Sequence, residues 1–325
     1  MNLYFETGSY DPAYNLAFEE YILENYTTGT VLILWQNDKA VIVGRNRNAE
    51  EEINRKFVEE HGIRVIRRTS GGGAVYHDLG NVNYSYITDA AATKEESIQP
   101  FLHRIIESLK LLGIEAESSG RNDILASGYK VSGTAQRLRR QRILHHGTLL
   151  FDVNIENMAE ALRVDAEKYK SKSAKSVRSR VTNIRRLLPE DMTVEGFLGQ
   201  LRTQLSDGFV KSTLSPEEVQ KVTELKKEKY DTWEWTFAHS PKYEYTNKKK
   251  WPSGILKVIL NIEDGRIYNA VFEGDFLSLL PAEEVAAGLV NCPYDRNAVK
   301  NKLELLPLDL YFGGITCEQI LDTFF

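Results

Sequence analysis

Cysteine is almost absent from this sequence, which contains only Cys292 and Cys317. Two cysteines near the end of the chain provide neither a disulfide framework nor a cysteine-based metal cluster, and such sparse use is typical of a reducing cytoplasm. We therefore expect a cytoplasmic protein with no structural metal. The six histidines form no H-E-x-x-H motif, so a zinc site is not expected either.

Long apolar runs and an early basic segment are also missing. No apolar run reaches the roughly 18 residues that a membrane-spanning helix needs, and the first basic side chain is Lys39. These absences predict no secretory signal and no membrane partner. The net charge of −5 argues against a general nucleic-acid-binding surface, so no nucleic-acid partner is expected. The length of 325 residues allows one large domain or two unequal ones.

The most informative stretch is residues 67–78, which read RRTSGGGAVYHD. Three glycines lie between two predicted strands, and the exposed N–H groups of such a loop can form a concavity that binds an anion. Arg67 or Arg68 would supply a charged clamp for a phosphate or carboxylate. A hairpin turn with two solvated arginines fits the composition equally well. The spacing matches neither a P-loop nor a dinucleotide-binding fingerprint.

Capping residues and periodicity predict most of the secondary structure. Asp11 followed by Pro12 predicts the start of a helix that continues to about residue 24. A second amphipathic helix is expected over residues 50–61. In residues 82–87 apolar and small polar side chains alternate, which predicts a strand with one packed face and one face that lines a site.

The second half of the chain contains two unusual basic segments. Residues 168–186 carry many lysines and arginines and no acidic residue. This composition fits a solvated segment, a nucleic-acid contact or a lid over an anionic ligand.

The aromatic run 233–237 is expected to be a strand. The polar run 247–250 is expected to be a linker, and it would separate a domain at residues 1–246 from a small one at residues 251–325.

Several polar side chains are candidates for chemistry on two anions. Lys130 lies between small residues, where it could offset charge on a carboxylate and on the α-phosphate of ATP. The alternative interpretation is that Lys130 is an ordinary lysine at a strand edge. Asn122 and Asp123 could help to hold Mg²⁺ beside phosphates, or Asp123 could cap a turn. His145 and His146 are adjacent on a predicted strand, so they point to opposite faces and cannot bind one metal together.

Five motifs occur in a fixed order and together resemble the signature of the lipoate–protein ligase family. They are RRTSGGGAVYHDLGNVN at residues 67–83, GRND at 120–123, KVSGTA at 130–135, HHGTLL at 145–150 and SVRSRVTN at 176–183. The resemblance extends from about residue 10 to the end of the chain. It implies an α+β catalytic domain of the biotin/lipoyl protein ligase type, which is similar to class II aminoacyl-tRNA synthetases, and a small α+β C-terminal accessory domain.

The resemblance also implies roles for individual residues. Lys130 matches the lysine that touches both ATP and lipoate, and it is the expected catalytic residue. The resemblance gives three further groups of residues: Arg68, Gly73, Ala74, Val75 and Tyr76 for ATP, Ser70, Gly71 and Gly72 for lipoate, and Lys172, Lys175, Ser176 and Arg178 for the adenylate-binding loop at residues 168–182.

The implied activity is an ATP-dependent ligation with Mg²⁺, in which lipoate becomes lipoyl-AMP and pyrophosphate leaves. A lysine of an apo lipoyl domain, on a 2-oxoacid dehydrogenase E2 subunit or on the glycine-cleavage H protein, would then accept the lipoyl group. A lipoyl or octanoyl transferase would use a cysteine nucleophile, and none lies within the motifs. A biotin ligase would carry a Gly-Arg-Gly-Arg-type loop, which this chain lacks. A non-catalytic binder of lipoyl-AMP is the remaining alternative.

Overall fold

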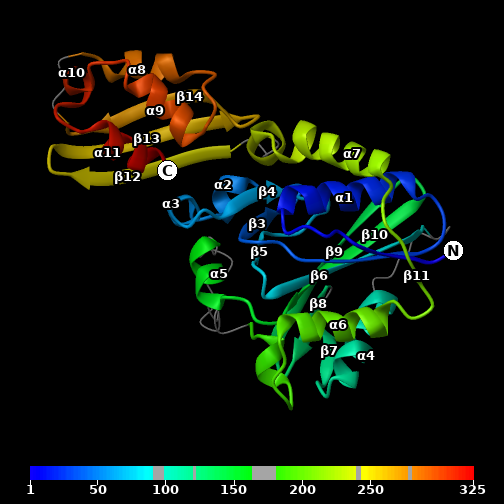
Figure 1. Cartoon of the computed structure of the whole chain (residues 1–325). Helices are drawn as coiled ribbons and strands as arrows, with labels where there is room; N and C mark the ends of the chain where they lie inside the picture. Colours follow the sequence, from blue (N-terminus) through cyan, green and yellow to red (C-terminus); the bar gives the residue numbers. More distant parts are fainter. Residues whose placement is uncertain (91–98, 120–121, 163–180, 239–242, 277–279) are drawn as a thin grey trace. The chain divides into compact units, whose positions relative to one another are not determined.

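The computed structural model describes residues 1–90, 99–119, 122–162, 181–238, 243–276 and 280–325. The chain divides into two compact units, Met1–Thr232 and Trp233–Phe325 (Figure 1). Each unit encloses its own cluster of buried apolar side chains. No helix in the described ranges is both long and apolar enough to cross a membrane.

The first unit combines helices with two sheets. Its helices are α1 (Pro12–Asn25), α2 (Ala49–Glu52), α3 (Arg55–Glu60), α4 (Gln99–Leu111), α5 (Ile155–Ala161), α6 (Val194–Leu205) and α7 (Pro216–Leu225), with a 3₁₀ turn at Ile184–Leu187 and a π-helical turn at Lys226–Tyr230. Its strands are β1 (Leu3–Glu6), β2 (Val31–Trp35), β3 (Ala40–Val43), β4 (Arg64–Arg67), β5 (Val75–His77), β6 (Asn81–Asp89), β7 (Ala116–Ser119), β8 (Asp123–Ala126), β9 (Tyr129–Arg139), β10 (Arg142–Leu150) and β11 (Val210–Lys211).

A mixed sheet of eight strands forms the centre of this unit, in the order β11-β1-β2-β6-β10-β9-β8-β7. Helices α4 and α6 cover one face of it, and α1 and α7 lie on the other side (Figure 1). On the α4 side the sheet contributes Val82, Tyr84 and Tyr86 to the buried cluster. Asn83 and Ser85 point to the opposite face, where Asn83 lines a cavity. The predicted alternation of residues 82–87 is therefore confirmed.

The smaller sheet of this unit carries the glycine-rich loop. Its strand order is β4-β3-β5, with β4 parallel and β5 antiparallel to β3. The loop at residues 68–74 connects β4 to β5, so the central strand β3 fixes both of its ends. A short sheet with a buried central strand thus holds the loop as a rigid rim over the larger sheet.

The helix expected over residues 50–61 is interrupted in the structure. The chain forms α2, leaves the helix at Ile53 and Asn54, and then forms α3. Ile53 makes an antiparallel bridge to Leu162, and the Asn54 side chain accepts a hydrogen bond from the N–H of Phe57 at 3.3 Å. Asn54 is therefore an N-cap rather than a mid-helix residue, and the single-helix prediction is wrong.

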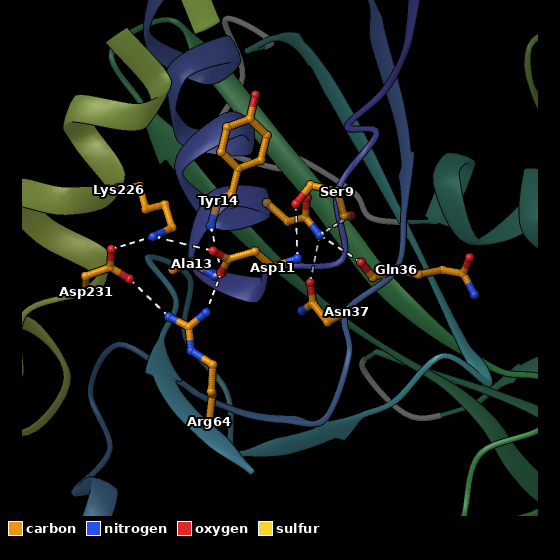
Figure 2. A network of polar contacts seen from close by, with 10 residues as sticks. Ser9, Asp11, Ala13, Tyr14, Gln36, Asn37, Arg64, Lys226 and Asp231 are labelled. Carbon is orange, nitrogen blue, oxygen red and sulfur yellow. Dashed lines mark hydrogen bonds and ion pairs between the residues drawn. The ribbon is translucent and has the colours of Figure 1, made fainter. Parts of the chain in front are cut away.

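A network of ion pairs joins the start of α1 to β4 and to the last turn of the first unit (Figure 2). Asp11 caps α1, because its Oδ1 accepts from the N–H of Ala13 at 2.9 Å. Arg64 donates to Asp11 at 2.5 Å and to Asp231 at 3.0 Å. Lys226 completes the ring with contacts to the same two carboxylates at 3.4 and 2.5 Å. The predicted helix start at Asp11 is confirmed.

This network predicts a stability difference that depends on pH. Burial alone would raise the pKa of Asp11, but Arg64, the Ala13 N–H and Lys226 outweigh burial and lower the pKa. The ionised form therefore stabilises the folded state above a pH of about 4, and this contribution is lost as the pH falls through the lowered value. Asp11→Asn keeps the capping oxygen and removes the charge, so it should cost roughly 0.5–1 kcal/mol at neutral pH.

Urea unfolding at several pH values would measure this difference. Asp11→Ala, which also removes the cap, should cost about 1 kcal/mol more than Asp11→Asn at neutral pH. The difference in unfolding free energy between the wild type and Asp11→Asn should disappear at acid pH. If this difference has the same size at all pH values, the charge of Asp11 does not contribute to stability.

The second unit is a sheet covered by short helices. It contains a π-helical turn (Glu234–Ala238), β12 (Tyr243–Trp251), β13 (Gly254–Glu263), β14 (Arg266–Gly274), α8 (Ala282–Leu289), α9 (Arg296–Leu303), α10 (Leu308–Phe312) and α11 (Cys317–Phe324). The strands form an antiparallel sheet in the order β12-β13-β14. One face of the sheet packs on the helices through residues such as Leu256, Val258 and Leu260.

Two expectations for this part of the chain are wrong. Residues 247–250 do not form a linker, because they lie inside β12 and pair with residues 255–258 of β13. β12 is an edge strand, and exposed lysines are common on such edges because they discourage pairing with other chains. The run 233–237 is helical rather than extended, and the compact second unit begins at Trp233.

Candidate active site

A cavity of about 200 Å³ lies between the glycine-rich loop and the polar face of the large sheet. This volume is below the roughly 300–1,000 Å³ of sites for drug-sized ligands. Segments that are distant in the sequence converge on it. The lining residues are Leu16, Trp35, Ile42, Arg68, Gly72, Gly73, Ala74, Val75, His77, Asn83, Asn122, Lys130, Gly133, Thr134, Ala135, His146, Gly147 and Thr148.

Two buried arginines shape the chain around the loop. Arg67 is fully buried, and its Nη1 lies 2.7–2.9 Å from the carbonyl oxygens of Gly44, Arg45 and Arg47. Arg68 donates from Nη2 to the carbonyl oxygens of Gly71 at 2.5 Å and Gly73 at 2.9 Å. Arg67 is therefore not available as a clamp for a ligand, and Arg68 serves the loop itself while it lines the cavity.

The environment of Arg68 keeps a positive charge beneath the loop. Burial lowers the pKa of Arg68 to about 10, with Glu19 and Glu52 acting in the opposite direction. The guanidinium consequently stays protonated at neutral pH. Glu52 also accepts a hydrogen bond from the N–H of Ala74 at 2.7 Å. The loop is thus held from both sides, by a cation at its carbonyl groups and by a carboxylate at its end.

Close backbone contact explains one glycine outside the glycine-rich loop. A Cβ on Gly44 would lie 1.9 Å from the carbonyl oxygen of Gly72 and 3.2 Å from Nη2 of Arg68. No other residue type fits there without movement of the loop. Gly72 itself has a φ of +92°, a backbone conformation that favours glycine. Gly71, in contrast, has open space around its Cβ position.

Lys130 reaches the same cavity from β9. Its Nζ lies 2.8 Å from Oδ1 of Asp123, and a Cβ on Gly133 would come within 3.2 Å of Nζ. Gly133 therefore provides the room in which the ammonium group lies. The Asn122 side chain donates to the Thr134 carbonyl at 2.8 Å, which fixes it beside Lys130. The backbone of Lys130 forms a parallel bridge to Val181.

A buried chain of hydrogen bonds runs beneath the loop. Arg68 Nε donates to Ser70 Oγ at 3.0 Å, and Ser70 Oγ lies 2.7 Å from His146 Nε2. His146 Nδ1 lies 2.9 Å from Oε1 of Glu19. Although this order of groups is that of a catalytic triad, Ser70 is only 1% exposed and does not line the cavity. The chain therefore connects the loop to α1, and it gives no nucleophile.

The structure places the expected site residues in three groups. Arg68, Gly72, Gly73, Ala74, Val75, Asn122 and Lys130 line one cavity. Ser70, Gly71, Tyr76 and Asp123 are not among the lining residues. Tyr76 lines a separate surface hollow with Asp78 and Asn154, and burial raises its pKa to about 12. Lys172, Lys175, Ser176 and Arg178, in the loop expected at residues 168–182, lie outside the described residues.

Sequence reasoning missed several residues of the cavity. Trp35 and His77 form part of the lining, and Glu19, which does not line the cavity, is buried against the lining residue His146. The alternation in residues 82–87 pointed to Asn83, but no local pattern marks Glu19, because α1 reads as an ordinary amphipathic helix. A single histidine such as His77 is more often a structural hydrogen-bonding residue than a catalyst, so its type alone did not mark it. The described residues contain no group of three or more His, Cys, Asp or Glu side chains placed to hold a metal ion.

Comparison with known proteins identifies the family to which the chain belongs. The family profile of the lipoyl protein ligase A/B catalytic domain matches residues 11–206, and that of the bacterial lipoate protein ligase C-terminus matches residues 240–324. The chain is 40% identical over 318 residues to the lipoate-protein ligase LplJ of Bacillus subtilis, covering 96% of each chain. It therefore belongs to the lipoate–protein ligase family, and the expected fold class is confirmed.

Two solved structures resemble the chain closely enough to support this conclusion. The bipartite lipoate protein ligase of Thermoplasma acidophilum, studied with its E2 lipoyl domain, superposes with a TM-score of 0.64 at 30% identity, over 73% of this chain and 95% of that one. A crystal structure of lipoate-protein ligase A bound with ATP gives a TM-score of 0.61 at 27% identity, over 73% of this chain and 97% of the other.

Proposed function

We propose that this chain attaches lipoate to a protein lysine in two steps that share one site. In the first step a carboxylate oxygen of lipoate attacks the α-phosphorus of ATP, pyrophosphate leaves, and lipoyl-AMP forms. In the second step the ε-amine of the acceptor lysine attacks the carbonyl carbon of this adenylate. The bond between that carbon and the AMP oxygen breaks, the nitrogen loses a proton, and an amide and AMP result.

The observation that carries this proposal is the meeting of Lys130 and the glycine-rich loop at one cavity. The first step brings two anions together, so it needs fixed cations and N–H donors rather than a nucleophile of the protein. Lys130 supplies a cation from β9. The backbone of Gly73 and Ala74 lines the cavity next to the charge of Arg68, although the N–H of Ala74 is donated to Glu52. We assign Lys130 to the reacting carboxylate and α-phosphate, and residues 73–75 with Arg68 to the nucleotide. Tyr76, which lines a separate hollow, is proposed for the nucleotide on the family resemblance alone.

The acyl part of the substrate fits the apolar part of the cavity. Leu16, Trp35 and Ile42 contribute this apolar lining, which suits a hydrocarbon chain with its ring. Ser70, Gly71 and Gly72 remain the proposed lipoate loop. Of the three, Gly72 lines the cavity, whereas Ser70 acts through its bonds to Arg68 and His146.

The residues beside Lys130 also suit a magnesium ion. Mg²⁺ prefers oxygen ligands and is commonly held by one or two carboxylates together with substrate phosphates. Asp123 offers a carboxylate, and the Asn122 side chain uses its nitrogen for the Thr134 carbonyl, so its oxygen remains as a second ligand. When bound, the ion would neutralise charge on the phosphates of ATP. Asp123 then orients either the ion or the Lys130 ammonium.

We propose apo lipoyl domains, on E2 subunits or on the glycine-cleavage H protein, as the acceptors in the cytoplasm. The study of the Thermoplasma ligase with an E2 lipoyl domain supports this class of partner. The scarcity of cysteine supports the reducing compartment. Residues 163–180 contain most of the proposed adenylate-binding loop. In the sequence they lie between Leu162 and Val181, and Val181 forms a bridge to Lys130.

Mass spectrometry of an apo lipoyl domain tests the proposal directly. The domain is incubated with the protein, lipoate and Mg·ATP, and pyrophosphate is followed in parallel. We expect a mass gain of one lipoyl group and an equal amount of pyrophosphate. A lipoyl domain whose target lysine is replaced by alanine is the matched control and should gain nothing. If folded protein releases no pyrophosphate with lipoate and ATP, the proposed function is wrong.

A further inference from the structure

Two arms of hydrogen bonds meet at one buried carboxylate, that of Glu19. The members are Arg68, Ser70 and His146 for the Arg68 arm, and Trp35 and Ser85 for the Trp35 arm. In the Trp35 arm, the indole N–H donates to Ser85 Oγ at 2.9 Å, and Ser85 Oγ donates to Oε1 of Glu19 at 2.5 Å. Arg68 and Trp35, at the far ends of the arms, both line the cavity. One side chain of α1 is thus connected to two parts of the site.

The far ends of the arms determine the direction of every hydrogen bond between them. A guanidinium and an indole N–H can only donate, so each arm begins with a donor at the cavity. In the Trp35 arm, Ser85 accepts from the indole and gives its own proton to Glu19. A carboxylate only accepts, so His146 donates from Nδ1, and Nε2 of the neutral ring accepts from the Ser70 hydroxyl. Both arms therefore need an acceptor where they meet, and Glu19 supplies it.

The register of the large sheet brings the two arms together beneath α1. His146 of β10 and Ser85 of β6 form a directly opposite pair, so their side chains point to the same face of the sheet. Trp35 pairs with Asn83, two residues before Ser85, and therefore shares that face. Helix α1 lies on this side of the sheet (Figure 1). Glu19 can reach both arms because they begin at neighbouring positions on paired strands.

Burial makes both arms depend on the Glu19 carboxylate. Every member of the arms is at most 7% exposed, so little water is available to replace a lost partner. A buried polar group that loses its hydrogen-bond partner costs free energy. The charge of Glu19 also opposes the effect of burial on the pKa of Arg68. A side chain without an acceptor at position 19 would consequently release the last donor of each arm at once.

We propose that Glu19 is a positioning residue that fixes Arg68 and Trp35 for adenylate formation. The proposal rests on the proposed function, which assigns Arg68 to the nucleotide and the apolar lining around Trp35 to the acyl chain. Glu19 does not line the cavity, so it acts on the substrates through the two arms. The sites for both substrates then depend on one acceptor, and each site depends separately on its own arm.

The KM values for ATP and for lipoate, measured by lipoate-dependent ATP–pyrophosphate exchange, test this role. Glu19→Met keeps an unbranched side chain of similar length and removes the acceptor. It interrupts both arms, so both KM values should rise about three- to tenfold. Ser85→Ala interrupts the Trp35 arm alone, so only the KM for lipoate should rise by that factor. Glu19→Gln keeps an acceptor oxygen and should keep both KM values within about twofold of wild type.

Glu20 provides a matched control on the same helix. It is also a buried carboxylate, and it accepts hydrogen bonds from Lys229 at 2.7 Å and from Tyr230 at 2.8 Å, neither of which lines the cavity. Glu20→Met removes a buried ion pair, so it should lower the melting temperature. Both KM values should nevertheless stay within about twofold of wild type. This control separates the loss of a buried carboxylate from the loss of the two arms.

Four outcomes would overturn the proposal: an unchanged KM for either substrate in Glu19→Met, an equal rise of both KM values in Ser85→Ala, equal effects of Glu19→Gln and Glu19→Met, or a rise in Glu20→Met as large as in Glu19→Met. If Glu19→Met does not fold, Glu19→Asp takes its place, because the shorter carboxylate cannot keep the same contacts with both arms. Unchanged KM values in that variant would also contradict the role. Failure of the proposed function looks different, because wild-type protein would then show no lipoate-dependent exchange.

Discussion

Replacing Lys130 by alanine is expected to abolish formation of lipoyl-AMP while the protein remains folded. In the proposed first step the carboxylate of lipoate meets the α-phosphate, and we assign the ammonium group of Lys130, which lines the cavity, to both anions. Removal of one preorganised donor to developing charge costs roughly 10²–10³-fold in kcat. Because the proposed role gives Lys130 two anions to bind, we expect a loss at the upper end of that range or beyond, measured by lipoate-dependent ATP–pyrophosphate exchange.

A matched control separates this effect from the loss of an ion pair. Lys221 forms a contact of 2.8 Å with Glu217, the same length as the contact between Lys130 and Asp123, but on the surface of α7. Lys221→Ala should leave the exchange rate unchanged, and both variants should have melting temperatures close to wild type. Full exchange activity in folded Lys130→Ala protein would refute the assigned role.

The sequence predicted the parts of the fold that local chemistry determines. Asp11 and Pro12 mark a helix start because a cap and a fixed φ act within one turn. The alternation of Asn83 and Ser85 with apolar neighbours marks a two-faced strand for the same local reason. The glycine-rich loop and Lys130 were recognised because their motifs are contiguous. Their meeting at one cavity depends on the pairing of β10 with β6 and β9, which no local pattern encodes.

The predictions that proved wrong involve tertiary contacts that override local preference. Residues 247–250 are polar and basic, and such a composition is common both in linkers and on edge strands. Only their pairing with β13 distinguishes the two. Similarly, Ile53 leaves its helix because Leu162 offers a bridge. The contact between Glu19 and His146 joins α1 to β10, so neither residue could be identified as part of the site from its own segment.

The role of Arg68 also differs from the simplest sequence interpretation. A basic residue before three glycines suggests a clamp that reaches out to a phosphate. In the structure the guanidinium turns inward to the carbonyl groups of Gly71 and Gly73. Those contacts hold the carbonyl side of the loop, and Glu52 holds the N–H of Ala74 at its end. The shape of the glycine-rich loop thus depends on the residues beneath it.

Gly44→Ala is expected to disable the site from outside the glycine-rich loop. The new Cβ would lie 1.9 Å from the Gly72 carbonyl oxygen, so the loop must move by more than an ångström. Displacement of positioning groups by about 1 Å can cost about 10²-fold in rate, and we expect at least that loss in ATP–pyrophosphate exchange. Overpacking should also cost about 1–3 kcal/mol of unfolding free energy, which thermal melting measures.

Gly71→Ala provides the comparison for stability, because the same added methyl group meets no heavy atom within 4 Å. Its melting temperature should equal that of the wild type or exceed it slightly, since alanine restricts the unfolded chain. The difference between the two variants thus isolates the contact between Gly44 and Gly72 from the general effect of losing a glycine. Equal melting temperatures, with full exchange activity in Gly44→Ala, would mean that the loop shifts freely and that its fixed shape is not needed for adenylate formation.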